Sequence, residues 1–152
     1  LDAVYQRTEQ MRKMGPKLAL NRMVELPGEQ LFPTPDNSYR GGWFRISVDS
    51  ALIIRGRLPK ARYFSLVLYN AWLESLDYQR HTITLNHSQL QLDDDGGFMV
   101  VLSHTDPGHP NWLDPAGHDA GFIIARALLP ESDIPELDVE MVLLSELATR
   151  LG

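Results

Sequence analysis

The chain contains no cysteine among its 152 residues, so it forms neither disulfides nor thiolate metal sites. It also lacks any run of about eighteen apolar residues, the length that a membrane-spanning helix needs. No basic and apolar leader stands at the start of the sequence, so we expect no secretory signal. Together these absences favour a cytoplasmic location, and the length suits one domain with a proper core.

Basic residues are scarce in the second half of the chain. From Asp93 to Gly152, the sequence has twelve acidic residues and two basic ones, Arg126 and Arg150. The net charge of the whole chain is −6, and no cluster of Lys and Arg is interleaved with aromatic residues. Such a surface repels a phosphate backbone, so we expect no nucleic-acid partner.

Motifs that would fix a reaction are absent too. There is no G-x-S-x-G nucleophile elbow and no glycine-rich phosphate loop between a strand and a helix. The acidic turn "DDDGG" at 93–97 lacks the Glu that a calcium-binding loop carries at its twelfth position. The sequence therefore leaves open whether the protein is an enzyme, and we expect no cofactor.

The first part of the chain has helical periodicity. In "LDAVYQRTEQMRKM", Val4, Met11 and Met14 fall near one face of a helix that Gly15-Pro16 would end. A second short helix is predicted from Pro16 to Met23. The segment 26–42 is rich in proline and glycine, which predicts a loop between this helical lead-in and the rest of the chain.

After Gly42 the period of the apolar residues changes to two, which is typical of strands. Residues 59–60 (Pro-Lys) suit a hairpin turn, and the glycines of 93–97 suit a turn with positive φ. For the tail at 137–147 we favour a strand over a helix. The predicted fold is an antiparallel sandwich or barrel over 36–152, preceded by a lead-in over 1–35. The expected strands lie at 42–49, 51–58, 61–70, 79–86, 88–92, 98–104, 121–130 and 137–147.

Five segments resemble a bacterial family known as domain of unknown function 1214. They are "PDNSYRGGWFRIS", "ARYFSLVLYN", "DDDGGFMVVLS", "DPGHPNWLD" and "GFIIARALLP", and the likeness extends from Asp36 to Leu147. The resemblance implies a mainly β, antiparallel, jelly-roll-like β-sandwich, often the C-terminal part of a longer protein. It implies no reaction. The bend at 70–82 departs from the family in lacking glycines.

The loop 104–121, "HTDPGHPNWLDPAGHDAG", holds three histidines that invite a metal hypothesis. His104, His109 and His118 have the spacing H-x4-H-x8-H. However, Asp106-Pro107 and Asp114-Pro115 are typical of turns in which the Asp caps backbone amides. We therefore predict no tightly held transition metal, and a rigid loop instead. Trp112 is predicted to anchor that loop by burying its ring beneath it.

Three polar residues share strand faces with apolar ones. By alternation, His104 lies with Leu102, His81 with Ile83, and Arg126 with Ile124. A buried Arg needs a partner. We expect Arg126 to pair with a carboxylate of the chain (Asp77, Glu74 or Asp93), the alternative being that it holds an anionic ligand. A Glu and an Asp at the 69–80 bend also suggest an acid–base pair, although a solvated edge is the simpler interpretation.

These features give two functional hypotheses. The first is a domain that binds a small organic ligand, anionic if Arg126 contacts it, at a rim formed by the loop 104–121 and the bend 69–80. The second is a non-catalytic module that packs on a copy of itself or on a partner domain N-terminal to this chain. The candidate ligand-binding residues are Tyr69, Arg80, His81, His104, Trp112, His118 and Arg126.

Overall fold

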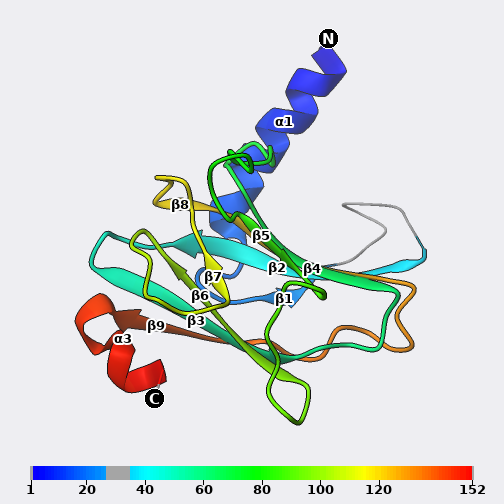
Figure 1. Cartoon of the computed structure of the whole chain (residues 1–152). Helices are drawn as coiled ribbons and strands as arrows, with labels where there is room; N and C mark the ends of the chain where they lie inside the picture. The colour runs from blue at the N-terminus through cyan, green and yellow to red at the C-terminus, as the bar shows by residue number, and fades with distance from the viewer. Residues whose placement is uncertain (1, 27–34, 152) are drawn as a thin grey trace.

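The computed structural model describes residues 2–26 and 35–151 of the chain. Among the described residues, helix α1 and a short 3-10 helix come first, strands follow, and helix α3 comes last (Figure 1). The elements are α1 (Asp2–Met14), η1 (Gly15–Lys17), β1 (Val24–Glu25), β2 (Asn37–Arg45), β3 (Ser50–Arg57), β4 (Tyr63–Tyr69), β5 (Thr84–Asn86), β6 (Gly97–Ser103), β7 (Trp112–Leu113), β8 (Ala120–Leu128), β9 (Asp138–Leu143) and α3 (Leu144–Leu151).

The strands form two sheets packed face to face, so the fold is the β-sandwich that the sequence predicts. One sheet has five strands in the order β1-β2-β8-β4-β5, and the other has four in the order β7-β6-β3-β9. In the described part of the chain, neighbouring strands are antiparallel except β6 with β7. The long central pairs β2–β8 and β4–β8 give the register that positions Arg126.

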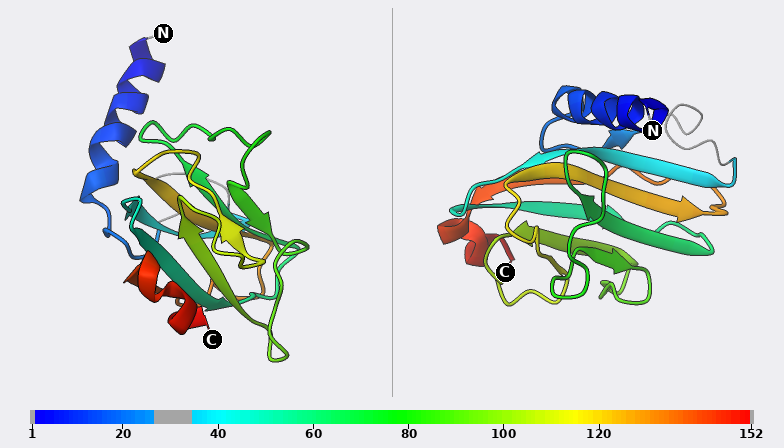
Figure 2. Two further views of the ribbon diagram at one scale, coloured as in Figure 1. Left: turned by 60° about the vertical axis from the view of Figure 1, so that its left-hand side comes forward. Right: turned by 90° about the horizontal axis from the view of Figure 1, so that it is seen from above.

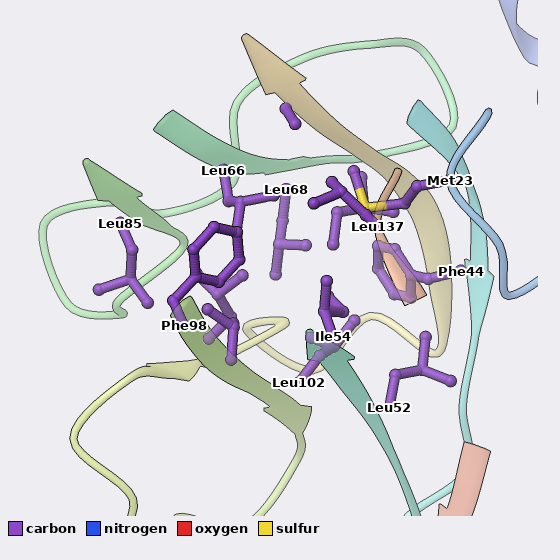
Figure 3. Packing of buried hydrophobic residues seen from close by; sticks show 14 of the residues in the cluster. Met23, Phe44, Leu52, Ile54, Leu66, Leu68, Leu85, Phe98, Leu102 and Leu137 are labelled. Carbon is purple, nitrogen blue, oxygen red and sulfur yellow. The ribbon is translucent and has the colours of Figure 1, made fainter. Parts of the chain in front are cut away.

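The interior between the sheets is filled by large apolar side chains (Figure 3). Phe44 from β2 and Leu66 from β4 face Leu102 from β6 and Ile54 from β3, and each is at most 1% exposed. Since such a core is close-packed, its residues hold the two sheets in one relative position. Met23 and Leu137 join the two sheets at one edge through an isolated antiparallel bridge.

The outer face of each sheet is covered in part by a terminal segment. Helix α3 covers the four-stranded sheet, where its Leu147 packs with Ile53 and Val101. On the five-stranded sheet, Gly15 lies against the ring of Trp43, so closely that a Cβ at this position would collide with it. Helix α1 itself extends away from the sandwich (Figure 2), and its Tyr5 is 65% exposed.

Several local predictions are wrong. Strand β2 begins at Asn37 rather than after Gly42, because Gly41 and Gly42 pair in register with Ile124 and Ile123. A side chain at Gly42 would collide with the backbone of the lead-in, so glycine here serves close packing rather than a loop. The rest of the predicted loop, 27–34, lies outside the described residues.

Other predicted turns, strands and helices also differ from the structure. Residues 59–60 do not turn a hairpin, because β3 and β4 belong to different sheets and the chain crosses between them here. The expected strand at 88–92 is a turn and coil, and the expected helix at 16–23 is only the 3-10 turn η1. The tail forms a strand, β9, and then a helix, α3, so neither single alternative describes it.

Candidate functional site

The loop 104–121 is tied to the sandwich mainly through Asn111. This side chain is 2% exposed. Its Oδ1 accepts a hydrogen bond from the Gln91 amide over 2.8 Å, and its Nδ2 donates to the carbonyls of Gln91 and Met99 over 2.8 and 2.9 Å. The next two residues form β7, which pairs with β6. The sequence indicates only that Asn111 caps a turn. In the structure, its side chain makes the most deeply buried hydrogen bonds of the loop.

The Trp112 side chain is less buried than the sequence predicts. Its ring is half-buried, and its Nε1 donates to the carbonyl of Ser103 over 3.0 Å. Leu113, beside it, is fully buried. The Asp-Pro turns form as predicted, since Asp106 Oδ1 accepts from the Gly108 amide and Asp114 Oδ1 from the Ala116 amide, both over 2.8 Å.

The three loop histidines point to different partners. His104 Nε2 lies 3.1 Å from Asp119 Oδ1, without the alignment of a hydrogen bond. His109 Nδ1 accepts from the Asn111 amide, and His118 Nδ1 lies 3.1 Å from the Pro115 carbonyl oxygen. Among the residues that the structure describes, no three His, Asp or Glu side chains converge as a metal site would require.

The loop meets the chain just after the 69–80 bend, at His81. Its Nδ1 lies 2.7 Å from Asp114 Oδ2, and the Asp114 amide donates to the carbonyl of Thr82 over 2.9 Å. Arg80 instead pairs with Asp77, 2.9 Å away on the exposed side of the bend. This pair lowers the pKa of the Asp77 carboxyl, chiefly through the Arg80 hydrogen bond. At the expected rim the loops therefore contact each other, and the side chains of Arg80 and His81 are paired with Asp77 and Asp114.

Arg126 lies on the predicted strand face, but that face is not the interior. Ile123, Ala125 and Ala127 of β8 point into the core, whereas Ile124 and Arg126 point to the outer face of the five-stranded sheet. The prediction of a carboxylate partner is wrong for the described part of the chain: Arg126 Nε donates to the side-chain oxygen of Asn37 over 2.8 Å, and its side chain is exposed.

Register places Arg126 in a cross-strand row with Tyr39 of β2 and Ser65 of β4. Residues in one such row have their Cβ atoms about 4.5–5.5 Å apart on one face of the sheet. Because Ser65 is small and Tyr63 and Tyr69 stand on the same strand face, a hollow of about 230 Å³ forms here. It is lined by Tyr39, Tyr63, Ser65, Val67, Tyr69, Ile124 and Arg126.

Two of the seven residues proposed from the sequence, Tyr69 and Arg126, thus line one pocket, and the other five do not. Burial raises the pKa of the Tyr69 phenol, while the Arg126 charge opposes that shift. Tyr69 is therefore a neutral hydroxyl donor at ordinary pH, next to a permanent cation. Sequence reasoning missed Tyr63 and Ser65. Their period of two with Tyr69 along β4 was a usable signal.

These observations define the class of protein: a two-sheet β-sandwich with a small aromatic and cationic pocket on the outer face of one sheet. The profile of the family described as protein of unknown function (DUF1214) matches residues 32–132, about two thirds of the chain. The chain belongs to this family, in agreement with the resemblance of its motifs. No curated protein matches the sequence.

Two solved structures are similar to the chain. An uncharacterized protein from Burkholderia cenocepacia is 26% identical, with a TM-score of 0.81, over 91% of this chain and 39% of that protein. A protein from Vibrio parahaemolyticus is 17% identical, with a TM-score of 0.54, over 87% of this chain and 42% of that protein. The second likeness shows the fold alone. The chain spans about two fifths of the length of both.

Proposed function

We propose that this domain binds a small organic molecule carrying a carboxylate or a similar anionic group, in the pocket on the outer face of the five-stranded sheet. The observation that carries the proposal is Arg126 itself. Its guanidinium is held at one nitrogen by Asn37, and in the described part of the chain no acidic side chain neutralises it. A guanidinium fixed in this way offers its remaining N–H groups as a fork for two oxygens.

The rest of the pocket suits the organic part of such a ligand. Tyr63 and Tyr69 offer aromatic surface, and Val67 and Ile124 give an apolar floor. Ser65 stands beside Arg126 in register and can donate a further hydrogen bond. A few polar groups in an otherwise apolar hollow are typical of small-molecule sites, and the volume of about 230 Å³ limits the ligand to a small one.

A thermal-shift series with benzoate and its neutral analogue benzamide tests this proposal. Ligands that bind only the folded state raise its melting temperature by mass action. We expect benzoate to stabilise the protein and benzamide to have little effect. Arg126→Leu should remove the benzoate effect, whereas Arg62→Leu should preserve it, because Arg62 is exposed and lies outside the pocket. Equal responses of the two variants to benzoate would contradict the proposal.

A second function, a module that packs on another subunit or domain, is favoured by α1. This helix extends from the sandwich, and its Tyr5 is exposed (Figure 2). Within the described residues, no helix is long and apolar enough to cross a bilayer. Light scattering of the chain with and without residues 1–14 tests this function. A larger assembly that is lost on truncation would support it, and a monomer in both cases would count against self-association.

A further inference from the structure

Another hollow in the described part of the molecule is separate from the Arg126 pocket. It is a cleft of about 870 Å³ at the edge where the two sheets are joined by the Met23–Leu137 bridge. β1 and Arg40 of β2 form one wall, and the end of β3, the start of β6 and the start of β9 form the other. No pattern in the sequence indicates this cleft, because its residues come from five separate segments.

The floor of the cleft is apolar. Met23, Phe98 and Leu137 line it, and each is between 3 and 4% exposed because it also belongs to the interior core. Figure 3 shows Met23 and Leu137 close together beside Phe44. Since these side chains are almost wholly buried, the floor offers only a narrow apolar surface, suited to the backbone carbons and small side chains of a ligand.

The rim, in contrast, carries charges of both signs. Some neutralise one another: Arg55 lies 3.0 Å from Glu140, and Arg57 lies 2.6 Å from Asp95. Arg40 is different. It is half-buried, its Nε donates to the carbonyl of Ile134 over 2.7 Å, and no described carboxylate lies within 4.0 Å of its guanidinium.

Acidic side chains on the same rim are also without an ion-pair partner among the described residues. They are Glu25, Asp93 and Glu136, all exposed; Glu25 lies opposite Arg40 in the β1–β2 register, whereas Asp93 and Glu136 belong to the other wall. A simple anion would be repelled by these carboxylates, and a simple cation by the arginines. A ligand with both charges, separated by a hydrocarbon or peptide stretch, would satisfy both sets.

We propose that this cleft binds a short zwitterionic peptide, with its terminal carboxylate on Arg40, its chain over the apolar floor, and its ammonium group beside Asp93 and Glu136 on the other wall. The volume of about 870 Å³ is more than one amino acid fills, and at about 3.3–3.6 Å per extended residue we take a peptide of about three residues as the probe. Arg40 is suited to the carboxylate because its fork is oriented by Ile134 and is partly shielded from water.

The first experiment measures the binding of four peptides by NMR chemical-shift titration of the full chain. They are trialanine, its N-acetylated form, its C-amidated form, and the doubly blocked form. We expect trialanine to bind with a dissociation constant of about 1 mM or below, and each block to weaken binding about tenfold, as the loss of one charge-assisted contact implies. Equal affinity of the free and doubly blocked peptides, or no binding of trialanine at millimolar concentration, would overturn the proposal.

The second experiment assigns the charges by matched variants. Arg40→Gln should weaken trialanine about tenfold but should not weaken the C-amidated peptide further, because that peptide has no carboxylate to lose. Glu136→Gln should show the same relation with the N-acetylated peptide. Arg62→Gln is the control and should change neither. If Arg40→Gln does not fold, the four peptides on the unaltered chain still decide the matter.

The cleft and the Arg126 pocket are independent of each other. Benzoate stabilisation that needs Arg126 can be present or absent whether or not trialanine binds. In the titration, shifts confined to residues of β4 and β8 would place the peptide in the Arg126 pocket and would overturn the assignment to the cleft.

Discussion

The two faces of the five-stranded sheet use the same strands for different purposes. On the inner face, Phe44, Leu66 and Ala125 pack against the second sheet and are almost wholly buried. On the outer face, one end carries Trp43 and Phe122, whose rings meet edge to face with centroids 5.0 Å apart, and is covered by the lead-in. The other end of the outer face carries Arg126, Ser65, Tyr39 and Tyr63, and Tyr69, which is in register with Phe122, lies at the border between the two ends.

This difference shows on which face of the sheet polar side chains can be accommodated. Where the second sheet covers the inner face, a polar group needs a partner within the protein, as Ser38 has in the Ile134 amide, so this face is almost entirely apolar. The outer face needs cover only over its most apolar part, and the remainder can hold a hollow with a cation in it. The Arg126 pocket lies on this half-covered face, and single substitutions on the two faces can test each part of that contrast.

A substitution on the inner face should cause the largest loss of stability. Phe44→Ala removes a ring that is 0% exposed, and it is expected to destabilise the protein by about 3–5 kcal/mol through lost burial and a residual cavity. Urea denaturation followed by circular dichroism measures this change. A loss below about 1 kcal/mol would mean that the interior is not a close-packed layer.

A substitution at the covered end of the outer face should cause a smaller loss of stability. Gly15→Ala places a methyl group against the ring of Trp43, so the lead-in must move, at a cost of about 1–3 kcal/mol. Trp43 should also become more accessible to an aqueous fluorescence quencher. Gly117→Ala serves as a control with open space around the new atom, although its φ of 80° adds its own strain. Unchanged stability and quenching in Gly15→Ala would show that the lead-in does not cover the sheet.

The contrast also explains how much the sequence could predict. Period-two alternation in β3, β4, β6 and β8 was enough for the sandwich, since every one of these strands has a continuous apolar face. Alternation identifies which residues share a face but not which face is inside. In β8 both faces are apolar over 122–125, so the pattern places Arg126 in the interior although it points outward.

Contacts between distant segments account for the remaining errors. Gly41 and Gly42 are typical of a loop by composition, but the lead-in packs on them and makes them part of β2. Asn111 has no local signal of burial, because its partners, Gln91 and Met99, come from other parts of the chain. The cleft beside Arg40 likewise exists only once five segments have come together.

Alkaline pH probes the border between the covered and open parts of the outer face. Because burial raises the pKa of Tyr69, the folded state holds this proton more tightly than the unfolded state does. Its contribution to stability is complete below the unfolded pKa of about 10 and is lost as pH rises through the higher folded value. Tyr69→Phe should therefore lose less stability than the unaltered protein between about pH 8 and pH 10.5, in urea titrations at each pH. Parallel losses in the two proteins would mean that the phenol is not buried.

The smallest effect on stability is expected at Arg126, and here the two possible positions of the residue make opposite predictions. An Arg buried in the interior with a carboxylate partner would cost about 3–5 kcal/mol to remove, since the partner would be left buried and charged. The structure instead gives Arg126 an exposed side chain and a neutral partner, Asn37. Arg126→Leu should then change the free energy of unfolding by less than about 1 kcal/mol, because only an exposed hydrogen bond is lost. The same urea titration that measures Phe44→Ala measures this variant, and Arg62→Leu gives the background for losing an exposed Arg. A loss near that of Phe44→Ala would return Arg126 to the interior and would remove the basis for a ligand site on the outer face.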